Sequence, residues 1–250
     1  DSALARYLGM LFYRGSGRPD DARIDGEYLR LAFANSPALY PQPLPSSLEH
    51  DLDVPPGLAR LNVLAFAGLS PVKKAETLRL PLGENRYLKI SLPYMVYRPS
   101  ASARVEIALD DGRRFDLELL EDIEAVARET YKAREGLIYL KTIIRAFLKS
   151  AGQAVFDAMA EDTEGGASLV YSILSLGSQI FAEASEQADI RISRYFPARA
   201  YAGGINLSPG RYSCEAFYYN AAGRVVASFR YEDILVQENR LNLVEVVCLK

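Results

Sequence analysis

The hydrophobic period of this chain changes twice, and that double change limits its fold more than any other feature. Apolar segments of strand length fill two parts of the sequence, and a long stretch with helical spacing separates them. β-Branched and aromatic residues are frequent in these segments, as is typical of strands. Those before the helical stretch are residues 60–67, 75–81, 86–92, 103–109 and 113–119. Those after it are residues 198–206, 211–219, 224–236 and 240–249.

The helical stretch covers residues 121–188. Apolar residues recur there at intervals of three and four. Gly136 and the pair Gly165-Gly166 are expected to interrupt it, because glycine weakens a helix. We therefore predict helices over residues 121–134, 137–160 and 167–187.

Strands, then helices, then strands predict an α+β fold. We expect an antiparallel β-sandwich over residues 58–250 with a helical insertion at residues 121–188. Asp110-Asp111-Gly112 is the strongest hairpin signal, because an Asp-Gly pair favours tight turns between strands. The alternative is two separate β units joined by helices. We favour one sandwich because the last four strand segments alone would form a thin core.

Residues 1–40 have the pattern of two helices joined by a short break. Apolar residues recur at helical spacing over Leu4–Phe12, and Asp20 or Asp21 can cap a second helix. The order of small and apolar residues resembles a tetratricopeptide repeat, although Gly26 replaces the usual aromatic residue. An unrelated two-helix hairpin is the alternative. Because such repeats stack in arrays, we expect this hairpin to end an array in a longer protein.

A proline-rich segment follows the predicted hairpin. Six prolines lie within residues 36–57, and we place a linker and a domain boundary at residues 41–57. Ser46 and Glu49 have the spacing of a capping box, which predicts a short helix over residues 46–52.

The composition narrows the chemistry that the chain can carry out. The 250 residues have a net charge of −3, include one His and two Cys, and contain no Trp. This charge disfavours nucleic acid as a partner, and a single His excludes multi-histidine metal sites. Because the sequence has no phosphate-binding glycine motif, we expect no cofactor. We also expect neither a signal peptide nor a transmembrane helix within this sequence.

Two places in the sequence hold groups with catalytic potential. Glu121 and Asp122 are adjacent carboxylates, and we predict that they cap the helix that starts there, because acidic residues are favoured in a first turn. The alternative is an acid–base pair, which needs two carboxylates facing each other across a cleft. His50 lies among acidic residues of the proline-rich segment. We predict a solvated loop histidine there rather than a metal ligand or catalyst.

Cys214 and Cys248 lie in two of the last strand segments, at positions that alternate toward the core. Their spacing matches neither a zinc site nor a Cys-x-x-Cys motif. We expect two buried free thiols. A disulfide between Cys214 and Cys248 is the alternative in an oxidising compartment.

Charged residues occur in blocks along the predicted insertion. Three basic residues recur every four positions from Lys141, the spacing of one helix face. Residues 150–190 contain acidic residues but no Lys or Arg. We predict that antiparallel helices complement each other across these surfaces, and the alternative is a basic patch for an anionic ligand or acidic partner. The candidate residues of that patch are Lys73, Lys74, Lys141, Arg145, Lys149, Arg191 and Arg194.

Several segments resemble the signature of an uncharacterised family of bacterial envelope lipoproteins. The segments Glu186–Arg191, Tyr195–Arg199 and Leu207–Tyr212 resemble the family patterns E-x-A-D-x-R, L-P-A and L-P-P-G-x-Y. Phe196 and Ser208 depart from the Leu and Pro of those patterns. Further similar segments are Gly68–Lys73, Leu119–Ile123 and the hairpin at residues 5–32.

The resemblance implies a periplasmic lipoprotein with tetratricopeptide-like helices in its N-terminal half. Such a protein would be held at the membrane through an N-terminal lipid that this chain lacks. The family has no assigned activity, so the resemblance provides no catalytic residue. We therefore predict a non-enzymatic binding or scaffold protein that contacts other envelope proteins. The alternatives are a carboxylate-dependent enzyme acting on cell-wall glycan or peptide, and a carrier or sensor of a small ligand or lipid.

Overall fold

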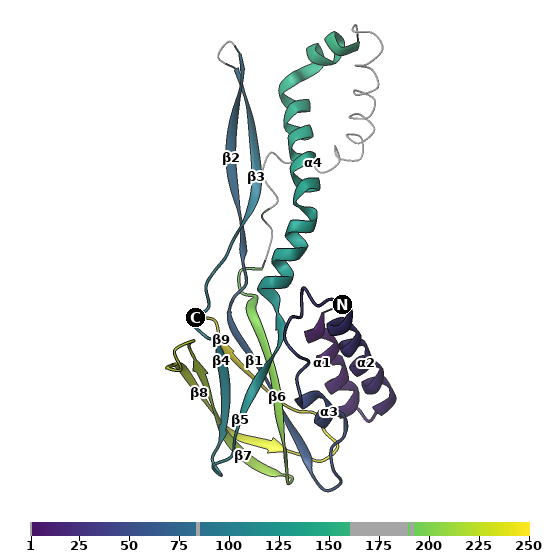
Figure 1. Ribbon diagram of the computed structural model, residues 1–250, viewed down its shortest axis with the longest axis vertical. Helices are drawn as coiled ribbons and strands as arrows, with labels where there is room; N and C mark the ends of the chain where they lie inside the picture. Colours follow the sequence, from purple (N-terminus) through teal and green to yellow (C-terminus); the bar gives the residue numbers. More distant parts are fainter. Residues whose placement is uncertain (1, 84–85, 161–189, 191–192) are drawn as a thin grey trace. The chain divides into compact units, whose positions relative to one another are not determined.

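The computed structural model describes residues 2–83, 86–160, 190 and 193–250 (Figure 1). The chain divides into two compact units. The first unit consists of Asp1–Pro71, Tyr97–Ala127 and Arg194–Lys250, and the second consists of Val72–Val96 and Arg128–Ser193. The hairpin at residues 1–40 and the proline-rich segment at residues 41–57 both fall within the first unit. The chain therefore divides elsewhere than at the predicted linker.

Each of the nine strand segments predicted from the sequence corresponds to a strand in the structure. Buried and less buried residues alternate along much of β7 and along β9, as expected for pleated strands with two different faces. The strands are β1 (Ala59–Leu69), β2 (Val72–Gly83), β3 (Arg86–Val96), β4 (Arg104–Leu109), β5 (Arg114–Asp122), β6 (Pro197–Leu207), β7 (Gly210–Tyr219), β8 (Val225–Val236) and β9 (Asn242–Cys248).

Seven strands form one sheet in the first unit, in the order β8-β7-β4-β5-β6-β1-β9. Neighbouring strands are antiparallel except β1 and β9, which are parallel. The edge strands β8 and β9 contact each other, so the sheet nearly closes on itself. The predicted α+β class is confirmed, but the predicted sandwich of two sheets is not. Register shifts in the β5–β6 and β7–β8 pairs bend the strands, and bending of this kind lets one sheet curl around its own core.

The insertion leaves and re-enters the sheet between two neighbouring strands. β5 and β6 pair directly, although the chain between Asp122 and Pro197 separates them.

Helix α4 (Ile123–Ala160) follows β5 at once and runs through Gly136, so the predicted interruption there is wrong. A single glycine costs a helix only about 1 kcal/mol, and the surroundings of Gly136 are open. The predicted break at Gly165-Gly166 and the predicted helix at residues 167–187 lie outside the described residues.

Strands β2 and β3 form a hairpin of their own in the second unit. They pair from Val72 with Val96 to Gly83 with Arg86, and they do not join the seven-stranded sheet. In the same unit, the Tyr131 hydroxyl of α4 donates a hydrogen bond to the carbonyl of Pro93. Among the helices of the described residues, none is both long and apolar enough to cross a membrane.

Strand β1 is buried on both faces, and its alternation separates two cores of the first unit. Its odd-numbered residues from Leu61 to Ala67 lie inside the curled sheet, where buried side chains from β4, β7, β8 and β9 surround them. Its even-numbered residue Leu64 packs against the helices α1 (Ala3–Gly15), α2 (Pro19–Asn35) and α3 (Ser47–Leu52). These helices lie together on one side of the sheet (Figure 1).

Helices α1 and α2 form the predicted hairpin and pack closely at Gly9. A Cβ atom on Gly9 would lie 2.3 Å from Oδ2 of Asp25. Asp25 is buried and forms an ion pair with Arg6 of α1, with 2.9 Å between Oδ1 and Nη1. The missing side chain therefore makes room for a polar contact between the helices. The hairpin is confirmed, whereas its assignment to the tetratricopeptide type is not.

We expect Gly9→Leu to lower the free energy of unfolding by about 1–3 kcal/mol, because the new side chain must displace the ion-paired Asp25. Urea denaturation followed by circular dichroism measures the change. Ala5→Leu, at an exposed position one turn earlier on α1, is the matched control and should stay within about 0.5 kcal/mol of the native protein. Equal stability of the two variants would contradict the close packing at Gly9.

Candidate functional site

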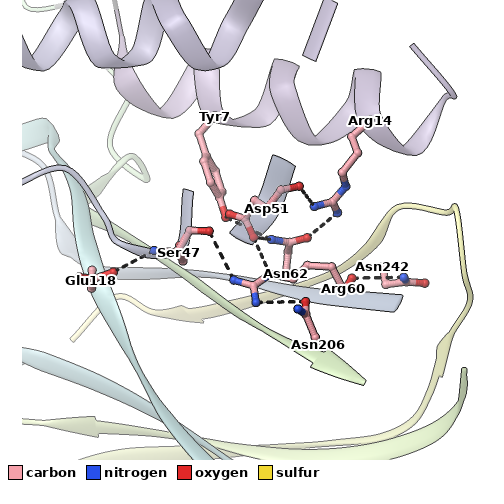
Figure 2. Close-up of polar contacts among 9 residues, drawn as sticks. All are labelled: Tyr7, Arg14, Ser47, Asp51, Arg60, Asn62, Glu118, Asn206 and Asn242. Carbon is pink, nitrogen blue, oxygen red and sulfur yellow. Dashed lines mark hydrogen bonds and ion pairs between the residues drawn. The ribbon is translucent and has the colours of Figure 1, made fainter. Parts of the chain in front are cut away.

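A polar cluster of the first unit surrounds the carboxylate of Asp51, which is fully buried. Figure 2 shows three side chains that donate hydrogen bonds to it from two elements. The Tyr7 hydroxyl of α1 lies 2.7 Å from Oδ2. Nε of Arg60 and Nδ2 of Asn62, both on β1, each lie 2.7 Å from Oδ1. The carboxylate therefore links α1, α3 and β1.

Burial changes the acid–base behaviour of Tyr7. The pKa of Tyr7 lies well above the usual value for tyrosine. The largest cause is burial of the hydroxyl, and the next is the negative charge of Asp51. The hydroxyl therefore stays protonated and remains a donor to Asp51. Since Asp51 is fully buried and holds three donors, we interpret it as an anchor between the helices and the sheet.

Arg14, near the end of α1, borders the same cluster. Its Nη1 donates to the carbonyl of Asp51 at 2.5 Å, and its Nη2 donates to Oδ1 of Asn62 at 2.7 Å (Figure 2). Both acceptors are neutral. Burial lowers the pKa of the Arg14 guanidinium, and the charge of Asp51 opposes this effect only in part. Within the described residues, no carboxylate lies within ion-pair distance of Arg14.

A groove of about 530 Å³ opens beside this cluster. The turn between α1 and α2, the segment after α3, the start of β1 and the turn between β8 and β9 line it. Asn242 holds the last of these turns against β1, because its Nδ2 donates to the carbonyls of Arg60 at 3.2 Å and Gln237 at 2.9 Å. The lining residues are Arg14, Gly17, Pro19, Leu52, Val54, Pro55, Pro56, Leu58, Ala59, Arg60, Glu238, Asn239 and Arg240.

Glu121 and Asp122 both cap helices, but they cap different ones. Asp122 Oδ1 accepts a hydrogen bond from the backbone of Ala125 at 2.8 Å, which caps α4 as predicted. Oε2 of the buried Glu121 accepts from Oγ of Ser2 and the backbone of Leu4, each at 2.7 Å. Glu121 therefore caps α1 rather than the helix that follows it. Neither carboxylate faces the other across a cleft.

A bulge in β5 explains the position of Glu121. The register between β5 and β6 shifts between Leu119 and Glu121, so Glu121 lies opposite Ala200. Residues opposite each other in an antiparallel pair share a face of the sheet, and the face of Ala200 and Ala202 is the one beneath the helices. The extra residue of the bulge thus turns Glu121 toward α1.

Glu118 of β5 holds the start of α3 in a similar way. Its Oε2 accepts hydrogen bonds from the backbone and the hydroxyl of Ser46, at 2.7 and 2.9 Å. The predicted capping box of Ser46 and Glu49 is therefore wrong, because the Ser46 side chain caps no backbone group of α3. The predicted short helix itself is confirmed. His50 is solvent-exposed, as predicted, but it lies within α3 rather than in a loop.

A second hollow of about 630 Å³, near β7 and β8, is lined by acidic residues that are already paired. Arg211 forms an ion pair with Asp233, and Arg230 forms one with Asp110, with 2.8 Å between Nη2 and Oδ2. In the part of the chain that the structure describes, no group of three or more His, Cys, Asp or Glu side chains could hold a metal ion.

The structure brings the residues of the predicted basic patch together only in part. Helix α4 runs without a break through Lys141, Arg145 and Lys149, so their backbone positions follow one side of the helix. Lys73 and Lys74 are neighbours on β2, and their side chains therefore point to opposite faces of the hairpin. Arg194 is exposed and belongs to the first unit, and Arg191 lies outside the described residues. The patch stays a prediction.

Cys214 and Cys248 are both buried, and both thiols are free. The structure therefore agrees with the expected free thiols and not with the alternative disulfide. Burial raises the pKa of the Cys214 thiol from its usual 9.0 to about 11, and the charge of Asp110 adds to the effect.

This shift predicts a pH dependence of stability. Below pH 9 the thiol is protonated in both the folded and the unfolded chain. Between about pH 9 and 11 it ionises only in the unfolded chain, so the free energy of unfolding should fall as the pH rises. Urea denaturation at pH 8, 9 and 10 measures the decline, which should be shallower in Cys214→Ala. An equal slope in both proteins would contradict the proposed burial of this thiol.

No protein-family model, no curated protein and no solved structure matches this chain. The resemblance to envelope lipoproteins therefore stays a prediction. Of the segments that carry it, Leu119–Ile123 contains the bulge and the helix cap, and Leu207–Tyr212 forms the turn from β6 to β7.

We expect Asp51→Asn to lower the free energy of unfolding by about 3–5 kcal/mol, because it leaves the buried guanidinium of Arg60 without its ion pair. Asp53→Asn removes the same charge at an exposed position two residues later and should have little effect. Chemical denaturation measures both.

The double variant Asp51→Asn with Arg60→Met tests the same contact directly. Its loss should be clearly smaller than the sum of the two single losses, because neighbouring groups couple. Strictly additive losses would contradict a direct interaction between Asp51 and Arg60.

Proposed function

We propose that this protein is a non-enzymatic binding or scaffold protein of the bacterial cell envelope that docks a partner protein on the outer face of the α1–α2 hairpin. The observation that carries the proposal is a set of five large apolar side chains that this face leaves between 38% and 58% exposed. We call this set the docking face, and its residues are Leu8, Phe12, Ile24, Tyr28 and Leu31.

The residues of the docking face are spaced along each helix so that they form a second apolar stripe. Leu8 and Phe12 lie one turn apart on α1, and the three residues of α2 follow at intervals of four and three. Each helix already buries a different stripe, which includes Tyr7 on α1 and Leu29 on α2. A helix that is apolar on two sides needs two partners, and within the residues that the structure describes the sheet is the one partner of these helices.

The charges around the docking face indicate the chemistry of the second partner. Asp20 pairs with Arg23 at 3.1 Å and Glu27 with Arg30 at 2.8 Å within α2. The other two carboxylates of α2 pair with arginines outside it, Asp21 with Arg18 and Asp25 with Arg6, so each acidic residue of α2 has a basic partner. The guanidinium of Arg6, already paired with Asp25, lies 4.5 Å from the centre of the Tyr28 ring. The partner therefore needs no opposite charge. An amphipathic helix with an apolar stripe of about two turns fits this face best.

Two further parts of the proposal rest on different support. The location in the periplasm, the lipid anchor and the choice of envelope proteins as partners rest on the sequence resemblance. The capping contacts of Glu121 and Asp122 support a binding role over a carboxylate-dependent enzyme, because both carboxylates are engaged by helix N-termini.

Photo-crosslinking in bacterial cells that produce the full-length protein tests the docking face. A benzophenone amino acid at Phe12 or at Leu31 should capture one envelope protein. The same group at Val225, an equally exposed apolar residue of β8, should not capture it. Capture of a second copy of this chain, or equal capture from all three positions, would contradict the proposal.

The captured protein is then purified and titrated against this chain. Phe12→Ala and Tyr28→Ala should each weaken binding by about thirtyfold, because truncating a central aromatic residue of an interface costs about 2 kcal/mol. Val225→Ala should leave binding unchanged. Calorimetry measures the dissociation constants, and unaltered binding of both aromatic variants would contradict the proposed docking face.

A further inference from the structure

The groove beside the Asp51 cluster has more positively charged than negatively charged side chains around it. Arg14, Arg60 and Arg240 line it, and Glu238 is the one acidic residue in the lining. Asp51, behind the lining, pairs with Arg60 at 2.7 Å between Oδ1 and Nε. Three guanidinium groups thus face two carboxylates. The groove and its immediate support carry a surplus of one positive charge.

Arg14 carries this surplus in an unusual environment. Its two hydrogen bonds go to a carbonyl and an amide oxygen, so neither acceptor neutralises its charge. Removing a cation from water without an ion pair is costly. A half-buried guanidinium that borders an open groove can recover part of this cost when an anion enters.

The other two charged residues lie on the turn between β8 and β9. Glu238 is already engaged, because its Oε1 accepts a hydrogen bond from the backbone of Gly57 at 3.1 Å. Arg240 is exposed and forms no ion pair with any residue that the structure describes. Between the two, Asn239 adopts a φ of 55°, the left-handed conformation that closes this turn. Arg240 is therefore an exposed cation at the edge of the groove, whereas the guanidinium of Arg14 is held by two hydrogen bonds.

Most of the remaining lining residues are apolar. Pro19, Leu52 and Val54 line the groove together with Pro55, Pro56 and Leu58. A concave site with apolar walls, a few polar groups and a volume between about 300 and 1,000 Å³ is typical of small-molecule sites. The groove has these three properties.

We propose that this groove binds a small organic acid with a single negative charge and an apolar body. The carboxylate would lie between Arg14 and Arg240, and the apolar body would lie along the proline-rich wall. A single charge on the ligand matches the single surplus charge of the groove. The site shares no residue with the docking face, so the two proposals can fail separately.

Calorimetric titration of the full chain with sodium octanoate tests the site. Octanoate should bind saturably with one molecule per chain. Octan-1-ol has the same chain length without the charge and should bind at least tenfold more weakly. Inorganic phosphate is an anion without the apolar body and should also bind at least tenfold more weakly. Equal or tighter binding of either control compound would overturn the assignment.

Substitutions then locate the site. Arg240→Gln removes an exposed cation without disturbing a buried contact, and Arg14→Gln removes the half-buried cation. Each should weaken octanoate binding about tenfold. Circular dichroism checks that Arg14→Gln is folded. Arg224→Gln makes the same change in the turn at the opposite end of β8 and should bind octanoate like the native chain.

Phe12→Ser separates the groove from the docking face, since an apolar anion could also adsorb there. This variant should keep its full affinity for octanoate. Loss of octanoate binding in Phe12→Ser, or native affinity in Arg240→Gln, would overturn the proposed site.

Discussion

The buried ion pair of Asp51 and Arg60 is the contact on which the rest of the first unit depends. It lies at the junction of α1, α3 and β1, where apolar packing alone would leave the helices free to slide over the sheet. Apolar contacts have no preferred direction, whereas a carboxylate with three donors at 2.7 Å fixes one arrangement. Glu118 and Glu121 of β5 add two more directional contacts, at the N-termini of α3 and α1.

These contacts determine what the helices leave for other molecules. Because the inner side of the α1–α2 hairpin is held by polar contacts, its outer apolar stripe is presented in one fixed orientation. The same contacts hold Arg14 at the edge of the groove with only neutral acceptors. Both proposed binding sites are thus consequences of how the helical hairpin is anchored.

The sequence predicts the elements of this fold better than their arrangement. Local period and turn residues suffice for the strands, for the helical hairpin and for the cap at Asp122. They do not reveal that β5 pairs with β6, because that pairing is decided by contacts between distant segments. Nor do they reveal the bulge that turns Glu121 toward α1. Asp51 left a signal, since it follows the buried Leu48 by one helical turn, and Arg60 and Asn62 alternate within an apolar strand. The sequence does not show that Arg60 and Asn62 donate hydrogen bonds to Asp51, because α3 and β1 meet only in the folded protein.

The pairing of β5 with β6 has a consequence for how this protein can change over evolution. Asp122 of β5 and Arg199 of β6 lie opposite each other in the strand pair. Their side chains form an ion pair, with 3.7 Å between Oδ2 of Asp122 and Nε of Arg199. The long excursion between these strands therefore departs and returns through adjacent residues. Its length can vary without altering the register of any strand in the sheet. Natural selection can lengthen, shorten or replace that segment as a cassette, while the sheet and its anchored helices stay the same.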